Sequence, residues 1–157
     1  MYWLGEKLKH NDDWMLAMSW SRIGALKKEL ALTSLDDIIT ILDGFGKLWT
    51  PNSELYQAAI PKLIEESGFS TAEVHSTLSL LPTLLSREGL EARVRAEFIN
   101  VNVLDTFSKM PHFQGMVKAV PKGVVLHVTA GNVFLSSIDS LIMGFLTKNI
   151  SIVKVSS

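Results

Sequence analysis

The chain has 157 residues, 47% of them hydrophobic and 20% charged, which fits one packed domain or part of a larger one and excludes a disordered or collagen-like chain. The net charge of −1 provides no basic footprint, so we expect no nucleic-acid partner. The chain has no cysteine, which excludes disulfides, thiolate metal sites and a cysteine nucleophile within these residues.

The N-terminal residues lack the pattern of a signal peptide, which is a basic stretch followed by an apolar core and a small-residue cleavage site. The most apolar region, residues 124–146, contains His127, Asn132 and Asp139, and is therefore a poor candidate for a bilayer span. We expect a cytoplasmic protein without a membrane span.

Residues 1–110 are predicted to be mainly helical. A first helix is expected to begin at Asn11 or Asp12 and to run to about Leu32, and a second to begin with Ser34 as its cap and to end before Pro51. Further helices are predicted from Asn52 to Gly68, from the capping box Ser70–Glu73 to Leu85 with a kink or an early end at Pro82, and from Arg87 to about Glu97.

The pattern changes near residue 111, where proline and glycine become frequent. Short β-branched runs predict strands at Met116–Val120 and Val124–Val128, with a turn at Pro121–Gly123 between them. An amphipathic helix after Asn132 is expected to close at Lys148–Asn149, and Ile150–Val155 reads as a second buried strand. This order predicts a βαβ unit with parallel strands and a right-handed crossover.

Two parallel strands alone do not make a stable sheet, because parallel sheets usually have several strands and are covered on both faces. We therefore expect this chain to be the front part of a longer protein that continues the sheet. Its two expected regions are residues 1–110, mainly helical, and residues 111–157, the start of an α/β domain.

Candidate functional residues lie at the carboxyl ends of the two predicted strands. Thr129 to Asn132 form the loop after the first strand, and Lys154 stands at the end of the second, on the same edge. Ligands of open α/β sheets bind at this edge. The ammonium of Lys154 could meet a ribose hydroxyl or a phosphate, or could simply be solvated, and spacing alone favours neither reading.

The histidines at positions 10, 75, 112 and 127 show no metal-ligand spacing. His127 is predicted to lie in the middle of a strand, where a hydrogen-bonded core histidine is more common than a catalytic one. Asp139 and Ser140 are adjacent, and no histidine is predicted within reach of them to form a catalytic triad.

Several motifs of residues 121–157 occur at consistent spacing: Pro121-Lys122-Gly123, Thr129-Ala130-Gly131-Asn132-Val133, Leu146-Thr147-Lys148-Asn149 and Val153-Lys154-Val155-Ser156-Ser157. This segment resembles the aldehyde dehydrogenase superfamily and, more closely, the LuxC-type acyl-CoA reductases, the fatty acyl reductases of bacterial luminescence and their non-luminous relatives. The resemblance implies an α/β fold, in which the helical N-terminal region precedes the first βαβ unit of an aldehyde-dehydrogenase-like Rossmann domain, here truncated.

The resemblance also implies a reaction in which a cysteine is acylated by a thioester, either acyl-CoA or an acyl-enzyme, and NADPH then reduces the acyl group to a long-chain aldehyde. Asn132 matches the asparagine whose amide stabilises the oxyanion, and Lys154 matches the lysine that contacts the cofactor ribose. Thr129, Ala130 and Gly131 would line the cofactor cleft. Ser157 stands where a glutamate favours NAD, so NADP is expected instead.

Two departures accompany this resemblance. Phe134 replaces a proline at the entry of the helix, and the cysteine of the family is absent, so we expect this chain alone to be inactive. Expected partners are a homo-oligomer or a fatty acid reductase complex with acyl-transferase and synthetase subunits. The alternatives are a non-catalytic helical interaction module with a remnant βαβ unit and a fragment of an NAD(P)-dependent aldehyde dehydrogenase.

Overall fold

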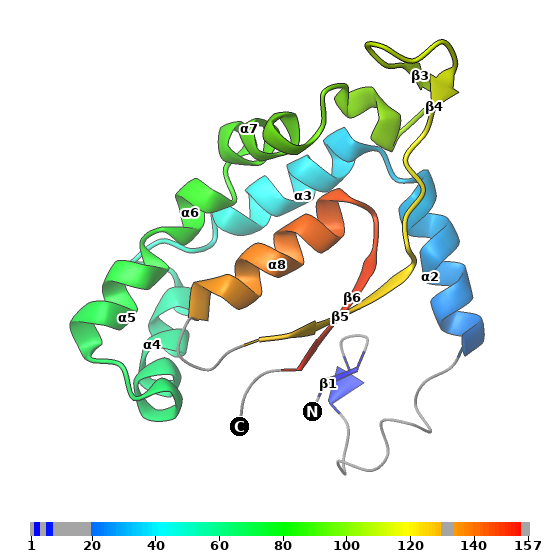
Figure 1. The fold of residues 1–157 in the computed structure, drawn as a ribbon. Coiled ribbons are helices and arrows are strands. Elements are labelled where there is room, and N and C mark those ends of the chain that lie inside the picture. The colour runs from blue at the N-terminus through cyan, green and yellow to red at the C-terminus, as the bar shows by residue number, and fades with distance from the viewer. Residues whose placement is uncertain (1, 4–5, 8–19, 130–133, 155–157) are drawn as a thin grey trace.

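A pair of parallel strands with one helix packed across it is the part of the fold that positions the candidate site (Figure 1). The computed structural model describes residues 2–3, 6–7, 20–129 and 134–154. Strand β5 (Val124–Val128) pairs in parallel with β6 (Ile150–Lys154), so that Val124 lies opposite Ile150 and Val128 opposite Lys154. Helix α8 (Phe134–Leu146) joins them and contacts both. The predicted strand–helix–strand order with parallel strands is confirmed.

The two faces of β5 have different surroundings, as the alternation of side chains in a strand requires. His127 faces α8, because its ring makes a hydrogen bond to Ser140 of that helix. Val124, Leu126 and Val128 point the other way, and Leu126 and Val128 are 62% and 71% exposed. Helix α8 therefore covers one face of the strand pair.

Serine caps begin four of the helices that precede the strand pair. In each case the serine hydroxyl accepts a hydrogen bond from the backbone amide three residues later, which satisfies one of the free amides of the first turn. The capped helices are α3 (Leu35–Gly46, cap Ser34), α4 (Glu54–Ser67, cap Ser53), α5 (Thr71–Leu78, cap Ser70) and α7 (Arg87–Glu97, cap Ser86). The capping box predicted at Ser70 and Glu73 is confirmed, since both of its reciprocal bonds are present.

Several predicted boundaries were wrong. Helix α3 ends at Gly46 rather than running on towards Pro51, because Leu48 and Trp49 bond back only three residues and tighten the chain into a turn. Helix α4 begins at Glu54, because the side chain of Ser53, not Asn52, caps it. The kink or early end predicted at Pro82 is present as a break between α5 and α6 (Leu81–Leu84), which places the proline in the first turn of α6.

The remaining helices and strands lie around the strand pair and the serine-capped helices. Helix α2 (Trp20–Leu32) ends where predicted, while the predicted start at Asn11 or Asp12 lies outside the described residues. The strand predicted at Met116–Val120 is shorter in the structure, where β4 covers only Met116–Val117. It pairs antiparallel with β3 (Ser108–Lys109), which was not predicted. The strand does not reach Ala119, whose amide bonds instead to the carbonyl of Val103 in the 3₁₀ helix η1 (Val101–Leu104). Strands β1 (Tyr2–Trp3) and β2 (Glu6–Lys7) form a small antiparallel pair. The predicted end of the last strand, Val155, lies outside the described residues.

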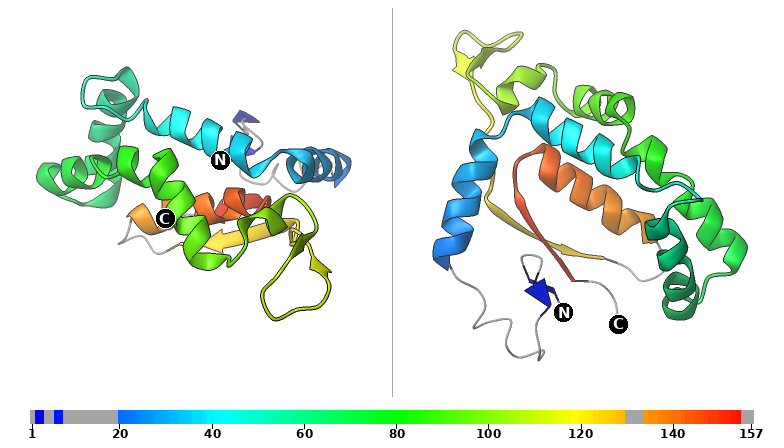
Figure 2. Two further views of the ribbon diagram at one scale, coloured as in Figure 1. Left: turned by 90° about the horizontal axis from the view of Figure 1, so that it is seen from above. Right: turned by 180° about the vertical axis from the view of Figure 1, so that it is seen from behind.

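Helix α3 occupies the centre of the hydrophobic core. It contacts α6 and α7 on one side and α8 on another, and Figure 2 shows this arrangement from above and from behind. Ile142 and Leu146 of α8 are buried in the same cluster as residues of the helical region, which are Leu35, Ile38, Ile39, Tyr56, Ile60, Val74, Leu78, Leu81, Leu85, Leu90, Val94 and Leu104. The strand pair is therefore attached to the helical region through α8, and α2 also contacts β6. Among the described residues, no helix has the length and apolar character needed to cross a bilayer.

Candidate functional site

Two of the predicted site residues meet at the carboxyl edge of the strand pair. The backbone amide of Thr129 donates to the carbonyl of Lys154 at 3.2 Å, which extends the parallel ladder by one bond beyond Val128. The Thr129 hydroxyl lies 3.4 Å from the same carbonyl, a weak contact. The Lys154 side chain is exposed. An exposed ammonium at the carboxyl edge of a parallel pair suits the ribose hydroxyls or phosphate of a nucleotide, so Lys154 fits that kind of group.

Four of the predicted site residues lie outside the described residues: Ala130, Gly131, Asn132 and Ser157. Their predicted roles therefore stay predictions. These residues are close in sequence to Thr129 and Lys154, since Ala130 follows Thr129 directly and Ser157 lies three residues after Lys154.

His127 is hydrogen-bonded to both of the other elements of the βαβ unit. Its Nδ1 lies 2.6 Å from the Ser140 hydroxyl oxygen and its Nε2 lies 3.1 Å from that of Ser151, so one ring joins β5, α8 and β6. The predicted hydrogen bonding of His127 is confirmed, but the residue is half-buried and lies outside the core cluster. The prediction that no histidine lies within reach of Ser140 was wrong, because His127 is 13 residues away in sequence and the crossover returns α8 onto its own strand.

The arrangement is nevertheless not a catalytic triad. Asp139 forms an ion pair with Arg93 of α7. Both ring nitrogens of His127 face hydroxyl groups, so no carboxylate orients the ring.

A second polar cluster lies at the amino ends of β5 and β6, where the Pro121–Gly123 motif meets the Leu146–Asn149 motif. The Asn149 Oδ1 atom accepts a hydrogen bond from the backbone amide of Gly123 at 2.9 Å, and the Asn149 amide group donates to the carbonyl and the hydroxyl of Thr147. Gly123 has φ +107, a conformation that other residues rarely adopt. The first and third of the motifs that carry the family resemblance are therefore in direct contact.

Lys148 ends α8 in an unusual way. It adopts φ +59, and the amides of Lys148 and Asn149 bond to the carbonyls of Phe145 and Gly144 at 2.8 Å, which is the Schellman arrangement that usually has glycine at this position. Its side chain is 4% exposed and its ammonium lies 2.6 Å from the carboxylate of Asp105. The same carboxylate accepts from the backbone amide of Leu35. Asp105 thus joins the end of α8 to the start of α3.

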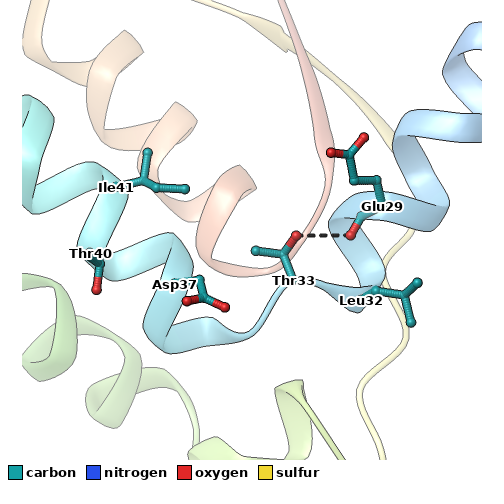
Figure 3. Close-up of a pocket in the computed structure, with 6 residues that line it drawn as sticks. All are labelled: Glu29, Leu32, Thr33, Asp37, Thr40 and Ile41. Atoms are coloured by element: carbon teal, nitrogen blue, oxygen red, sulfur yellow. Dashed lines mark hydrogen bonds between the residues drawn. The ribbon is translucent and has the colours of Figure 1, made fainter.

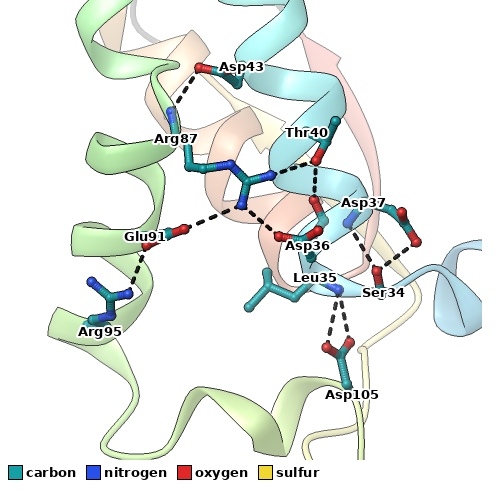
Figure 4. Close-up of polar contacts among 10 residues, drawn as sticks. All are labelled: Ser34, Leu35, Asp36, Asp37, Thr40, Asp43, Arg87, Glu91, Arg95 and Asp105. Carbon is teal, nitrogen blue, oxygen red and sulfur yellow. Dashed lines mark hydrogen bonds and ion pairs between the residues drawn. The ribbon is translucent and has the colours of Figure 1, made fainter.

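Arg87 organises the charged residues between α3 and α7 (Figure 4). Its guanidinium contacts Asp36 at 2.6 Å, Thr40 and Glu91, and its pKa is raised, chiefly by the hydrogen bond to Asp36. The pKa of Asp43 is lowered by the hydrogen bond from Lys47 and then by that from the Arg87 amide. Glu91 also forms an ion pair with Arg95 at 2.8 Å. These residues stabilise helix packing and lie on elements other than β5, α8 and β6.

A surface groove lies elsewhere, at the junction of α2 and α3 (Figure 3). It has a volume of about 510 Å³, and its lining residues are Glu29, Leu32, Thr33, Asp37, Thr40 and Ile41. None of these belongs to the strand pair or to α8. In the part of the chain that the structure describes, no three histidine or carboxylate side chains are grouped so as to hold a metal ion.

The fold and edge geometry define an α/β protein with a parallel βαβ unit and a polar carboxyl edge. The sequence profile of the acyl-CoA reductase (LuxC) family matches residues 30–157. The chain belongs to that family.

Named relatives support the same assignment. Long-chain acyl-protein thioester reductase from Aliivibrio fischeri is 31% identical over 161 residues, which cover 97% of this chain and 33% of that protein. The proteins of the same name from Photorhabdus laumondii and Vibrio harveyi are 33% and 31% identical, over 78% and 79% of this chain and 26% of each relative. The chain thus spans about a third or less of the relatives it matches.

Proposed function

We propose that this chain is the N-terminal part of a reductase that converts a long-chain acyl thioester to an aldehyde with NADPH. Membership in the acyl-CoA reductase family supports the reaction class, and relatives named long-chain acyl-protein thioester reductase support the substrate class. The observation that carries the nucleotide part is the meeting of Thr129 and the exposed Lys154 at the carboxyl edge of a parallel pair. The βαβ unit would be the first of an aldehyde-dehydrogenase-like Rossmann domain.

Lys154 would hold the nucleotide through its ammonium, which donates up to three hydrogen bonds to ribose or phosphate oxygens. Ser157 would stand near the ribose without the negative charge that repels a 2′-phosphate, which favours NADP over NAD. Thr129, Ala130 and Gly131 would line the cleft. NADPH bound at this edge would supply the hydride.

Asn132 would donate its side-chain amide to the oxyanion that develops on the thioester carbonyl. A neutral amide suits this task because it donates a hydrogen bond without ionising near neutral pH. The nucleophile that accepts the acyl group would be a cysteine of the whole protein outside these 157 residues, which contain none. The chain alone would then bind nucleotide without turning over.

The test uses the whole protein and two substitutions with a matched control. Lys154→Ala is expected to raise the NADPH dissociation constant about 10-fold, because it removes charge-assisted hydrogen bonds. Lys122→Ala changes another exposed lysine, before β5 at the opposite edge, and is expected to leave that constant unchanged. Asn132→Ala is expected to lower kcat for reduction of a long-chain acyl thioester about 10²-fold or more while the thioester still binds.

The NADPH affinity and the activity of the whole protein distinguish the three candidate functions. A wild-type protein that binds no NADPH, or a Lys154→Ala variant with the wild-type constant, would contradict the nucleotide site. A wild-type protein that oxidises aldehydes but does not reduce thioesters would instead support an ordinary aldehyde dehydrogenase. Absence of both activities would support a non-catalytic interaction module.

A further inference from the structure

We propose that His127 is a positioning residue that holds α8 at one register over β5 and β6 and thereby sets the affinity of this unit for its nucleotide. The proposal rests on the proposed function for its ligand. It rests on the observed geometry for the contact itself, in which one imidazole bridges the hydroxyls of Ser140 and Ser151.

Apolar packing would not fix this register by itself. Hydrophobic contact is non-directional, so a helix can shift along a sheet with little change in buried area. Hydrogen bonds of 2.6 and 3.1 Å demand particular positions of the three side chains. A shift of α8 by about 1.5 Å, the rise of one residue, along the direction of the Ser140 contact would lengthen it from 2.6 Å to beyond hydrogen-bond distance.

Gly144 allows this close approach. A Cβ atom at this position of α8 would collide with the hydroxyl oxygen of Ser151 and would lie 3.4 Å from the Nε2 atom of His127. The absence of a side chain at Gly144 therefore lets the helix settle onto the bridging ring. His127, Ser140, Gly144 and Ser151 form one contact between the helix and both strands, which we call the histidine bridge.

The chemistry of the histidine bridge suits a geometric role. A hydroxyl can donate or accept, so both bonds can form with either tautomer of the neutral ring. The nearest carboxylate in sequence, Asp139, is engaged by Arg93. The ring is therefore built to hold three elements together and has no partner that would activate it as a base.

The bridge stands close to the edge where the nucleotide would bind. His127 precedes Thr129 by two residues, and Ser151 precedes Lys154 by three. In α/β sheets a phosphate is bound between the carboxyl end of a strand and the start of the following helix, so the position of the helix on the strands determines the fit. Loosening the bridge should weaken nucleotide binding without touching any group that contacts the nucleotide.

The test compares His127→Phe with His127→Gln in the whole protein. Phenylalanine keeps the ring volume and removes both hydrogen bonds, and we expect the NADPH dissociation constant to rise about 10-fold. Glutamine can donate to one hydroxyl and accept from the other, and it is expected to stay within about 3-fold of wild type. The control, His75→Phe, removes a histidine that bonds to Tyr56 in the helical region and should leave the constant unchanged.

A second readout separates this proposal from the proposed function. Hydrogen exchange of the α8 amides is expected to be faster in His127→Phe and close to wild type in His127→Gln, whether or not nucleotide binds. If the wild-type protein binds no NADPH, the proposed function fails and the exchange rates alone decide the role of His127. If the phenylalanine variant does not fold, Ser140→Ala and Ser151→Ala take its place, each expected to weaken binding about 3-fold. Wild-type affinity and exchange in His127→Phe, or equal losses in His127→Phe and His127→Gln, would overturn the proposal.

Discussion

The side-chain oxygen of Asn149 accepts a hydrogen bond from the backbone amide of Gly123 at 2.9 Å, and this bond ties the residue before β5 to the residue before β6. The two residues are 26 positions apart and belong to different motifs of the family resemblance. Gly123 also accepts at its carbonyl from the Ile150 amide at 2.8 Å. The parallel pair is therefore secured at its amino edge by two adjacent bonds, which sets the register for the opposite edge, where Thr129 meets Lys154.

Asn149→Ala should lower the free energy of unfolding by about 1–3 kcal/mol, because it leaves the buried Gly123 amide without its acceptor. Urea denaturation followed by circular dichroism measures this change. Asn52→Ala is the control, since Asn52 is exposed and is expected to change stability by less than about 0.5 kcal/mol. Equal losses in the two variants would show that the bond to Gly123 does not hold the strand pair.

The pair of Lys148 and Asp105 should respond asymmetrically to substitution. Asp105→Ala leaves a buried ammonium without a partner and removes the acceptor of the Leu35 amide, so we expect a loss of about 2–3 kcal/mol. Lys148→Met leaves a carboxylate that is 37% exposed and still bonded to Leu35, so the loss should be about 1 kcal/mol. Urea midpoints of the two variants and of the double variant measure these costs and their coupling. A larger loss in Lys148→Met would contradict this account of the pair.

The sequence predicted the features that depend on neighbouring residues. Ser34 and Ser70 cap helices as their local patterns indicated. The apolar residues at helical spacing after Ser70 are buried: Val74, Leu78, Leu81 and Leu85 are 2%, 0%, 1% and 2% exposed. The meeting of Thr129 and Lys154 also followed from the sequence, because parallel strands end at the same edge.

The sequence did not reveal the long-range polar contacts. Asp105 lies 43 residues from Lys148, and neither the spacing nor the type of these residues indicates that α8 ends beside the start of α3. The bridge from His127 to Ser140 was missed for the same reason. A glycine inside an apolar helix, Gly144, was the available signal of a close approach to the sheet. The roles of Ala130, Gly131, Asn132 and Ser157 stay predictions.

The capping box of α5 should make stability depend on acidity. The hydrogen bond from the Ser70 hydroxyl, followed by that from the Ser70 amide, lowers the pKa of Glu73 below its usual 4.5. Because the folded pKa is the lower one, the ionised carboxylate stabilises the fold above about pH 4.5, and this contribution disappears as pH falls through the folded pKa. The stability difference between wild type and Glu73→Gln should therefore shrink on acidification from pH 7 to pH 3.

Ser70→Ala provides the matched variant for the same test. It removes the cap itself and should cost about 1 kcal/mol at pH 7. The free energy of unfolding measured in urea across this pH range checks both variants. A difference between wild type and Glu73→Gln that stays constant or grows towards pH 3 would show that the carboxylate is not stabilised by the box.

Two glycines inside helices should respond in opposite directions to the same substitution. A Cβ added at Gly44 of α3 meets no atom within 4 Å, so Gly44→Ala should raise the free energy of unfolding by about 0.5–1 kcal/mol through helix propensity. At Gly144 of α8 the new methyl group would collide with the Ser151 hydroxyl and crowd His127, so Gly144→Ala should lower it by about 1–3 kcal/mol. Thermal unfolding of both variants measures the contrast, and a stabilised Gly144→Ala protein would mean that α8 does not pack against the strands as closely as the histidine bridge requires.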